Sequence, residues 1–433
     1  MCCEIYWQHG WVLTVLLDTN AYDLQMINAL ALGNISEQQI NDELERYFWR
    51  YAKSFERAPQ RKYFEATIRG LLSGLDRKSI EPIALHFLGQ SKVRGMQQFF
   101  KRSKGWQENL TQRYQTQLSR QLTSPDGFAS IDESDFVKKG TNSAGVARQY
   151  CGRVGKRENC QSGVFLSYAS EKGYGLLEAK LYIPKHWFDK DYTEKRETCH
   201  IPKTTTFQTK NQMAIEMLNK KITDPQFPIK WVGCDSTFGC DHSFLDGLPQ
   251  SVHYFASVKE DEYIFLTMPK MGIPLPKRGP QSKQPRALEA PVCIASLGSE
   301  EAICWERRTL AQGTKGPLIA DIKCVRAFSC RRINNNLFVP GVPIWVYIRR
   351  YEDGTLKYFI SNAPEDTEQG VLDRLATMRW SIEQCFLECK SYLGMGHYEA
   401  RSYQAWHRHM LLVMVAHLFT SVLRGYFKKR VFF

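Results

Sequence analysis

The order of β-rich and helical segments between residues 128 and 259 constrains the fold of this 433-residue chain most strongly. Runs rich in β-branched and aromatic residues predict strands, and apolar residues at a helical spacing predict a helix. The pattern is strand, strand, strand, helix, strand, strand. In chain order the segments are the run that ends at Asp132, then 162–170, 176–184, the helical stretch 209–222, 229–235 and 252–259.

Three meandering strands, a crossover helix and a fourth strand form the opening of the ribonuclease H fold. In that fold one carboxylate lies on the first strand and a second comes just after the fourth, and Asp132 and Asp235 occupy those two places. A β-rich insertion follows, in which two runs flank Asp353-Gly354, a strong hairpin signal. We therefore expect an α/β protein with a ribonuclease H-like (retroviral-integrase-like) core, a β-rich insertion and an α-helical N-terminal domain.

The same patterns predict the division of the chain into domains. Long amphipathic stretches before the turn cluster TSPDG (123–127) indicate a separate helical region. The predicted parts are a helical, DNA-binding domain (1–122), the first part of the core (123–260), a basic loop with the β-rich insertion (261–362), and the catalytic helix with C-terminal helices that complete the core (363–433).

The segment RWSIEQCFLECK (379–390) carries a line of charges within a helical pattern. At 100° per residue Arg379, Glu383 and Lys390 fall within about 40° of one another, with apolar residues on both sides of them. We expect a single helix from 371 to 393, with a separate polar face open to solvent, formed by Ser381, Gln384 and Glu388. On spacing alone, the charged line is either an internal salt bridge or a functional site.

Composition favours a polyanionic partner. The formal net charge is +13, from 58 Lys and Arg against 45 Asp and Glu. Lys138, Lys139 and Arg148 follow Asp132, and we expect them to contact DNA. The Pro- and Gly-rich loop at 270–286, which includes Lys277 and Arg278, has five basic residues and no acidic one, and its natural partner is a phosphate backbone. A further basic and aromatic cluster at 92–106 fits either a DNA-contacting helix or an ordinary solvated helix face.

The cysteines and apolar runs bear on the compartment. Thirteen scattered cysteines without a C-x-x-C pair are typical of free thiols in a reducing cytoplasm. The N-terminal apolar run does not have the pattern of a secretory signal, and the apolar segment 410–426 is short for a membrane span, so we expect a buried helix there. A cytoplasmic protein, associated with the nucleoid when bound to DNA and without a membrane partner, is the expectation.

Several blocks of the chain resemble DDE-type insertion-sequence transposases. RWSIEQCFLECK matches most of the signature Tyr-x2-Arg-x3-Glu-x6-Lys of these enzymes, and residues 131–170 are similar to the first-aspartate block of insertion-sequence family 701. FQTKNQMAIEML and WVGCDSTFG resemble the approach to the second aspartate. LGMGHYEARSYQAWHRH (393–409) resembles the segment after the glutamate, and the overall similarity covers about 60 to 420.

The resemblance implies that Asp132, Asp235 and Glu383 are the catalytic residues and bind Mg²⁺ or Mn²⁺, as two ions. It also implies that Arg379 and Lys390 contact phosphates at the transposon end. One position departs from the signature, because Ala376 stands where the tyrosine is expected. Asp135 is the rival first ligand, and it would face away from Asp132 on an extended strand unless the strand ends between them, as we expect.

The predicted activity is that of a DDE transposase, which cleaves double-stranded DNA at its element's ends by metal-dependent hydrolysis and joins the 3′-hydroxyl ends to target DNA. Since two ends must be held together, a homodimer is expected in the synaptic complex. Two alternatives remain at this stage: a nuclease of the same fold without strand transfer, and a non-catalytic DNA-binding descendant.

Overall fold

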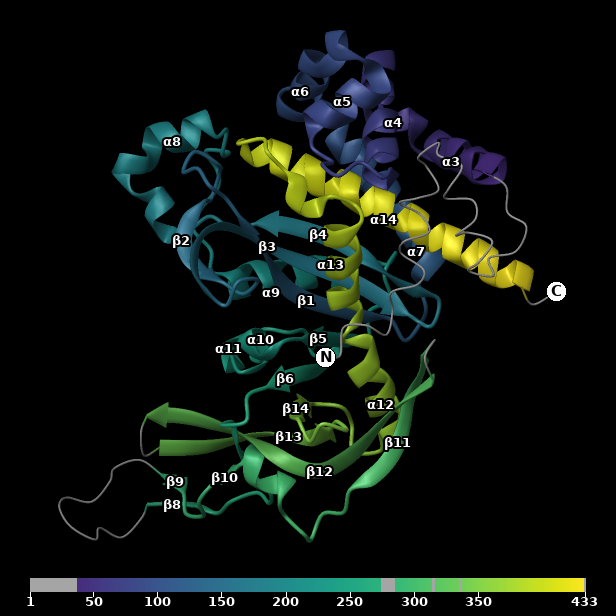
Figure 1. The fold of residues 1–433 in the computed structure, drawn as a ribbon. Helices are drawn as coiled ribbons and strands as arrows, with labels where there is room; N and C mark the ends of the chain where they lie inside the picture. The colour runs from purple at the N-terminus through teal and green to yellow at the C-terminus, as the bar shows by residue number, and fades with distance from the viewer. Residues whose placement is uncertain (1–36, 274–284, 314–315, 335–336, 432–433) are drawn as a thin grey trace. The chain divides into compact units, whose positions relative to one another are not determined.

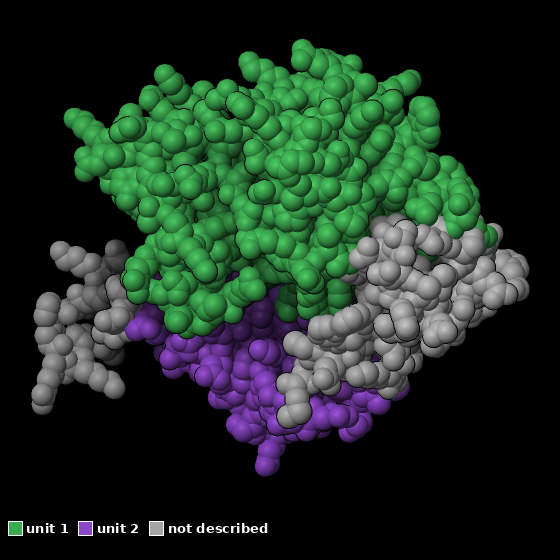
Figure 2. Space-filling view, turned by 45° about the horizontal axis from the view of Figure 1, so that its top comes forward, with its two compact units in different colours: residues 1–127, 131–228, 381–433 green, residues 128–130, 229–380 purple. Residues whose placement is uncertain are grey.

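The computed structural model describes residues 37–431, except 274–284, 314–315 and 335–336. The chain divides into two compact units (Figure 2). Unit 1 comprises Met1–Gly127, Ile131–Pro228 and Ser381–Phe433, and unit 2 comprises Phe128–Ser130 and Ile229–Trp380. Helices and strands are both well represented, so the fold is mixed α/β, as predicted (Figure 1).

Unit 1 is mainly helical between residues 37 and 122. Its helices are α3 (Glu37–Tyr51), α4 (Ala58–Leu72), α5 (Ile80–Leu88), α6 (Val93–Lys101) and α7 (Gln107–Leu122), with short 3₁₀ turns at Ala52–Ser54 and Gln90–Lys92. Each buries an apolar stripe, because its large side chains recur at three- and four-residue spacing.

The long C-terminal helix α14 (Tyr403–Val431) runs beside these N-terminal helices (Figure 1). Arg408 of α14 is 1% exposed. Its guanidinium donates hydrogen bonds to the carbonyls of Phe99 (3.2 Å) and Phe100 (2.9 Å), to the carbonyl of Ser103, and to Oε1 of Gln107 (3.1 Å). The N-terminal helices thus share a buried polar centre with α14.

The described part of unit 1 contains four strands. They are β1 (Phe128–Val137, which enters unit 1 at Ile131), β2 (Ala147–Cys151), β3 (Lys156–Ser170) and β4 (Gly173–Leu181). β3 lies next to β1, and β2 and β4 are antiparallel to β3. The remaining helices of unit 1 are α8 (Thr193–Thr198), α9 (Lys210–Ile222) and α13 (Ser381–Ser391), with 3₁₀ turns at Lys185–Phe188, Lys190–Tyr192 and Met395–His397.

Unit 2 contains a larger part of the sheet, in the order β10-β7-β12-β13-β14-β6-β5-β1, where β1 contributes Phe128–Ser130. Its strands are β5 (Trp231–Cys234), β6 (His253–Val258), β7 (Tyr263–Phe265), β8 (Met271–Gly272), β9 (Arg286–Ala287), β10 (Val292–Cys293), β11 (Glu306–Gly313), β12 (Gly316–Asn334), β13 (Leu337–Arg350) and β14 (Leu356–Ser361). Its helices are α10 (Ser236–Gly239), α11 (His242–Asp246) and α12 (Gln369–Met378), with a 3₁₀ turn at Ile294–Gly298.

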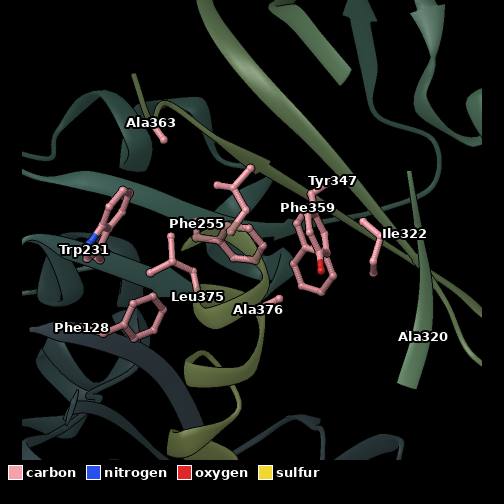
Figure 3. Close-up of a cluster of buried hydrophobic side chains, with 11 residues drawn as sticks. Phe128, Trp231, Phe255, Ala320, Ile322, Tyr347, Phe359, Ala363, Leu375 and Ala376 are labelled. Atoms are coloured by element: carbon pink, nitrogen blue, oxygen red, sulfur yellow. The ribbon is translucent and has the colours of Figure 1, made fainter. Parts of the chain in front are cut away.

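β5 and β6 are parallel, and the insertion extends the sheet from β6 through the antiparallel strand β14. α12 packs on this sheet through a buried cluster (Figure 3). The cluster consists of Phe128, Trp231, Phe255, Ala320, Ile322, Tyr347, Phe359, Ala363, Leu372, Leu375 and Ala376.

The predicted order of strands and crossover helix is confirmed as β1, β3, β4, α9, β5 and β6. The hairpin around Asp353-Gly354 is also confirmed, since β13 pairs with β14 and Gly354 adopts a φ of +81° that suits glycine. Strand β2 was not predicted. The expectation that the first strand ends between Asp132 and Asp135 is wrong, because β1 continues to Val137.

The predicted single helix at 371–393 is also wrong. The structure has two helices, α12 and α13, separated by a turn at Arg379–Trp380. The break coincides with the boundary between the units, because unit 2 ends at Trp380 and unit 1 resumes at Ser381. Arg379 therefore does not share a helix face with Glu383 and Lys390.

Candidate active site

Asp132 lies on β1 in unit 1 and is half-buried. Its Oδ1 accepts a hydrogen bond from the backbone N–H of Glu133 at 2.6 Å. The side chain of Glu133 forms an ion pair with Lys210 of α9. Glu133, the next residue along the strand, therefore already has a cationic partner.

Asp135, the rival of Asp132, is 8% exposed. Its Oδ2 accepts a hydrogen bond from the backbone N–H of Gly152 at 2.8 Å, in the turn between β2 and β3. Its Oδ1 is buried without a hydrogen-bond partner in the described part of the chain. Asp135 thus anchors the β2–β3 turn, and it is more deeply buried than Asp132.

Glu383 and Lys390 lie in the first and last turns of α13. Together with Leu387 they are the half-buried residues between 381 and 390, and every other position there is buried. The expectation of charges flanked by buried surface therefore holds for Glu383 and Lys390. Their stripe is the part of α13 that solvent can reach between residues 381 and 390.

The predicted solvent-facing polar side of α13 is wrong, because Ser381, Gln384 and Glu388 are all less than 9% exposed. The carboxylate of Glu388 accepts three hydrogen bonds. The donors are the hydroxyl of Tyr174 on β4 (2.8 Å), Nε2 of Gln384 (3.0 Å) and Nε2 of His417 on α14 (2.7 Å). Polar partners from two other elements offset the cost of burying the Glu388 carboxylate.

The ammonium of Lys390 lies 5.5 Å from the ring centre of Phe386. Burial lowers the pKa of Lys390, and the positive charge of Arg153 lowers it further. The carboxylates of Asp135 and Asp132 act in the opposite direction and raise it. Unit 1 thus brings the Lys390 ammonium, Asp132, Asp135 and the β2–β3 turn into one electrostatic neighbourhood.

Asp235 follows β5 in unit 2 and caps the N-terminus of α10. Its Oδ1 accepts hydrogen bonds from the backbone N–H groups of Thr237 (3.0 Å) and Phe238 (3.3 Å), and its Oδ2 accepts one from the hydroxyl of Thr237 (3.0 Å). A carboxylate offers about four acceptor positions. These bonds orient the group and leave acceptor capacity on Oδ2.

Arg379 also belongs to unit 2. Its guanidinium carbon is 6.0 Å from the ring centre of Phe359 on β14. A Cβ atom built on Gly233 would lie 3.3 Å from Cγ of Arg379 and 2.4 Å from Cζ of Phe128, so the absence of a side chain at Gly233 lets both residues pack onto β5.

The three predicted ligands divide between the units, with Asp132 and Glu383 in unit 1 and Asp235 in unit 2. Among the described residues, no group of three or more His, Cys, Asp and Glu is placed to hold a metal ion. The donor chemistry fits Mg²⁺ or Mn²⁺, since all three residues offer carboxylate oxygens and Asp235 retains acceptor capacity. Their joint role as ligands stays a prediction.

The other predicted DNA-binding residues differ in accessibility. Lys138 is half-buried and donates to the carbonyl of Tyr398, and burial lowers its pKa to about 8. Lys139 and Arg148 are exposed. Lys277 and Arg278 lie outside the described residues.

Ala376, which replaces the signature tyrosine, is 4% exposed within the buried cluster of unit 2 (Figure 3). Its methyl group packs in the protein interior, so this position offers no side chain to a substrate.

Sequence reasoning missed the hairpin formed by β2 and β3, which carries exposed Tyr150, Arg153, Lys156 and Arg157. A signal was present, because Gly152 and Gly155 mark a turn between two polar runs.

None of the helices in the described residues has the length and apolar character needed to cross a membrane.

Comparison with known proteins identifies the family. No curated protein matches the chain. The model of a family described as DDE superfamily endonuclease matches residues 50–317, which is more than half of the chain. The match includes Asp132 on β1 and Asp235 after β5, and it ends before α13. This family implies a ribonuclease H-like fold, with which the mixed sheet is consistent. The chain therefore belongs to the DDE superfamily endonucleases.

Proposed function

We propose that this protein is a DNA transposase that binds the ends of its mobile element, cleaves them and joins the resulting 3′-hydroxyl ends to target DNA. The observation that carries the proposal is the position of two carboxylates within the family match: Asp132 lies on the first core strand and Asp235 directly follows β5. The stripe of Glu383 and Lys390 on α13 supports it, because a third carboxylate there is half-buried and a cation follows two turns later.

Asp132, Asp235 and Glu383 are the proposed holders of two divalent ions. When bound, such ions activate a water or a 3′-hydroxyl and stabilise the leaving oxygen of a phosphodiester. The residues themselves act by orientation. The N–H groups of α10 fix the Asp235 carboxylate, and the buried flanks of α13 fix the direction of Glu383.

Two cations are proposed to hold the DNA near the cut. Lys390 offers an ammonium from α13, and Arg379 offers a guanidinium from the turn after α12. The partial desolvation that lowers the pKa of Lys390 also strengthens its attraction to a phosphate, because the local dielectric is lower than in bulk water. A homodimer in the complex with both ends belongs to the same proposal.

The central test is Glu383→Gln, which removes one charge and preserves the shape of the side chain. We expect loss of cleavage by at least about 10³-fold, with binding to the ends within a few-fold of wild type, because a metal ligand acts on chemistry rather than on DNA affinity. Glu197→Gln is the matched control, since Glu197 is exposed at the end of α8. This variant should cleave DNA at the wild-type rate. Cleavage by Glu383→Gln at the wild-type rate would remove Glu383 from the ligand set.

Incubation of pre-cleaved ends with a target plasmid and Mg²⁺ separates the transposase from its alternatives. A transposase yields joined product, and a nuclease of the same fold yields none. A non-catalytic descendant would bind the ends with wild-type affinity and neither cut nor join them. Chelation of the divalent ion should stop both reactions without abolishing binding.

A further inference from the structure

A 20-residue stretch of unit 1, Lys138 to Arg157, carries six basic residues and no acidic one. Most of it forms the turn after β1, strand β2 and the start of β3. Lys139, Arg148, Arg153, Lys156 and Arg157 are exposed. None of these five forms a salt bridge with an acidic side chain in the part of the chain that the structure describes. The cations are therefore available for an external anion.

The pairing of β2 with β3 gathers part of this charge on one face of the hairpin. Arg148 and Tyr150 are two residues apart on β2 and so point to the same side. Tyr150 lies opposite Arg157 on β3, and Arg148 lies opposite Asn159. Directly opposed residues of an antiparallel pair share a face, so Tyr150, 64% exposed, lies between two arginines.

Both ends of this face are fixed to the rest of unit 1. At one end Nδ2 of Asn159 donates to the carbonyls of Lys138 (2.6 Å) and Gly140 (3.1 Å), which holds the loop that carries Lys139. At the other end the turn is anchored by Asp135, whose carboxylate accepts the N–H of Gly152 at 2.8 Å. A backbone held in this way loses little conformational entropy when the hairpin binds a ligand.

The anchor also relates the hairpin to the candidate active site within unit 1. Asp135 is three residues after Asp132 on the same strand. Arg153, in the anchored turn, is near enough to Lys390 to lower the pKa of its ammonium. A DNA backbone whose phosphate contacts Lys390 would therefore have Arg153 and the other cations of the hairpin available for its neighbouring phosphates.

We propose that the β2–β3 hairpin is a DNA-binding arm. Arg148, Arg153 and Arg157 contact phosphates of duplex DNA beyond those bound by Lys390, and Tyr150 packs against a sugar or base between them. The inference rests on the proposed function and deepens it, because it assigns to the hairpin the DNA next to the cleavage site. Guanidinium groups suit this task, since they bind phosphate oxygens in a bidentate manner.

The charge contribution is tested with Arg148→Gln/Arg157→Gln and a matched double variant, Lys190→Gln/Lys203→Gln, whose lysines are exposed elsewhere in unit 1. The probe is a fluorescent duplex of about 30 base pairs of arbitrary sequence, titrated in EDTA at several salt concentrations. Each lost phosphate contact should reduce the slope of log K against log salt by about 0.9, so the hairpin variant should lose about 1.8. The corresponding loss of affinity at physiological salt is about 30-fold, and the control should stay within about twofold.

The aromatic contribution is tested with Tyr150→Ala and Tyr150→Phe on the same probe. Alanine should weaken binding at least about threefold without changing the salt slope, because the ring carries no charge, and phenylalanine should retain wild-type affinity. Wild-type binding by the arginine pair variant would overturn the arm, and wild-type binding by Tyr150→Ala would remove the ring from it.

Failure of the arm and failure of the proposed function give different results. A wild-type protein that cleaves and joins ends, together with an arginine pair variant of unchanged affinity and slope, refutes the arm alone. A wild-type protein without cleavage, together with a variant of reduced slope, leaves the arm in place and refutes the transposase.

Discussion

Glu388 on α13 offers a sharp test of how the candidate active site is supported. Its carboxylate is 7% exposed and accepts hydrogen bonds from Tyr174, Gln384 and His417. Replacement by glutamine preserves the volume but converts one oxygen to an amide that donates hydrogen bonds. Oε1 accepts from both Tyr174 and Gln384, so the amide is best tolerated at the position of Oε2, which faces Nε2 of His417.

The expected cost follows from that geometry. Hydrogen bonds to a charged group contribute about 1.5–3 kcal/mol each, and Glu388→Gln loses at least one of the three. A change of tautomer at His417 would let its Nε2 accept from the amide, but it would place a proton on Nδ1, which is buried without a partner among the described groups. We therefore expect the free energy of unfolding to fall by about 2–3 kcal/mol.

The measurement is thermal unfolding followed by circular dichroism. For a unit of the size of unit 1, a loss of this size corresponds to a Tm lower by roughly 3–5 °C. Glu197→Gln serves again as the control, because Glu197 is exposed and should melt within about a degree of wild type. If the Tm of Glu388→Gln equals that of the Glu197→Gln control, the buried hydrogen bonds of Glu388 do not stabilise α13 and the reasoning fails.

Two further outcomes concern unit 2 and the response to acid. Gly233→Ala should lower the free energy of unfolding in urea by about 1–3 kcal/mol, because the new Cβ would lie 2.4 Å from Cζ of Phe128; unchanged stability would contradict the close packing over β5. Burial lowers the pKa of His409 from 6.5 to about 4. Between these pH values the unfolded chain takes up a proton at this residue and the folded chain does not, so the full free energy of unfolding is present above about pH 6.5 and falls as the pH drops toward 4. His409→Gln should therefore remove up to about 3 kcal/mol of the loss in unfolding free energy that acid causes, which appears as a smaller fall of Tm with pH. Identical pH profiles of Tm for the variant and the wild type would refute this assignment.

The strand order was predictable because buried strands carry β-branched and aromatic residues whatever their partners. Strand β2 was not, since Arg148, Gln149 and Tyr150 include no run of apolar residues. The strand exists because it pairs with β3, and pairing is a tertiary effect that local propensity does not contain.

The candidate site was predictable only in part. The half-buried stripe of Glu383 and Lys390 follows from helical periodicity within α13. The periodicity runs on unbroken through Arg379 and Trp380, which include neither glycine nor proline, so the sequence gives no sign that the helix ends there. Burial of Glu388 depends on His417, a residue 29 positions away, and no local pattern reveals that pairing.

The buried guanidinium of Arg408 has a practical consequence for dissection of this protein. A fragment that ends at residue 122 would leave the carbonyls of Phe99 and Phe100 without their donor, and the complementary fragment would lose the groups that hold the Arg408 guanidinium. Each hydrogen bond from this charged donor contributes about 1.5–3 kcal/mol, so their combined loss is a large share of the stability of an ordinary domain. Excised N-terminal helices that fail to bind DNA would therefore report a misfolded peptide, and point substitutions in the full-length chain are the sound way to locate DNA contacts.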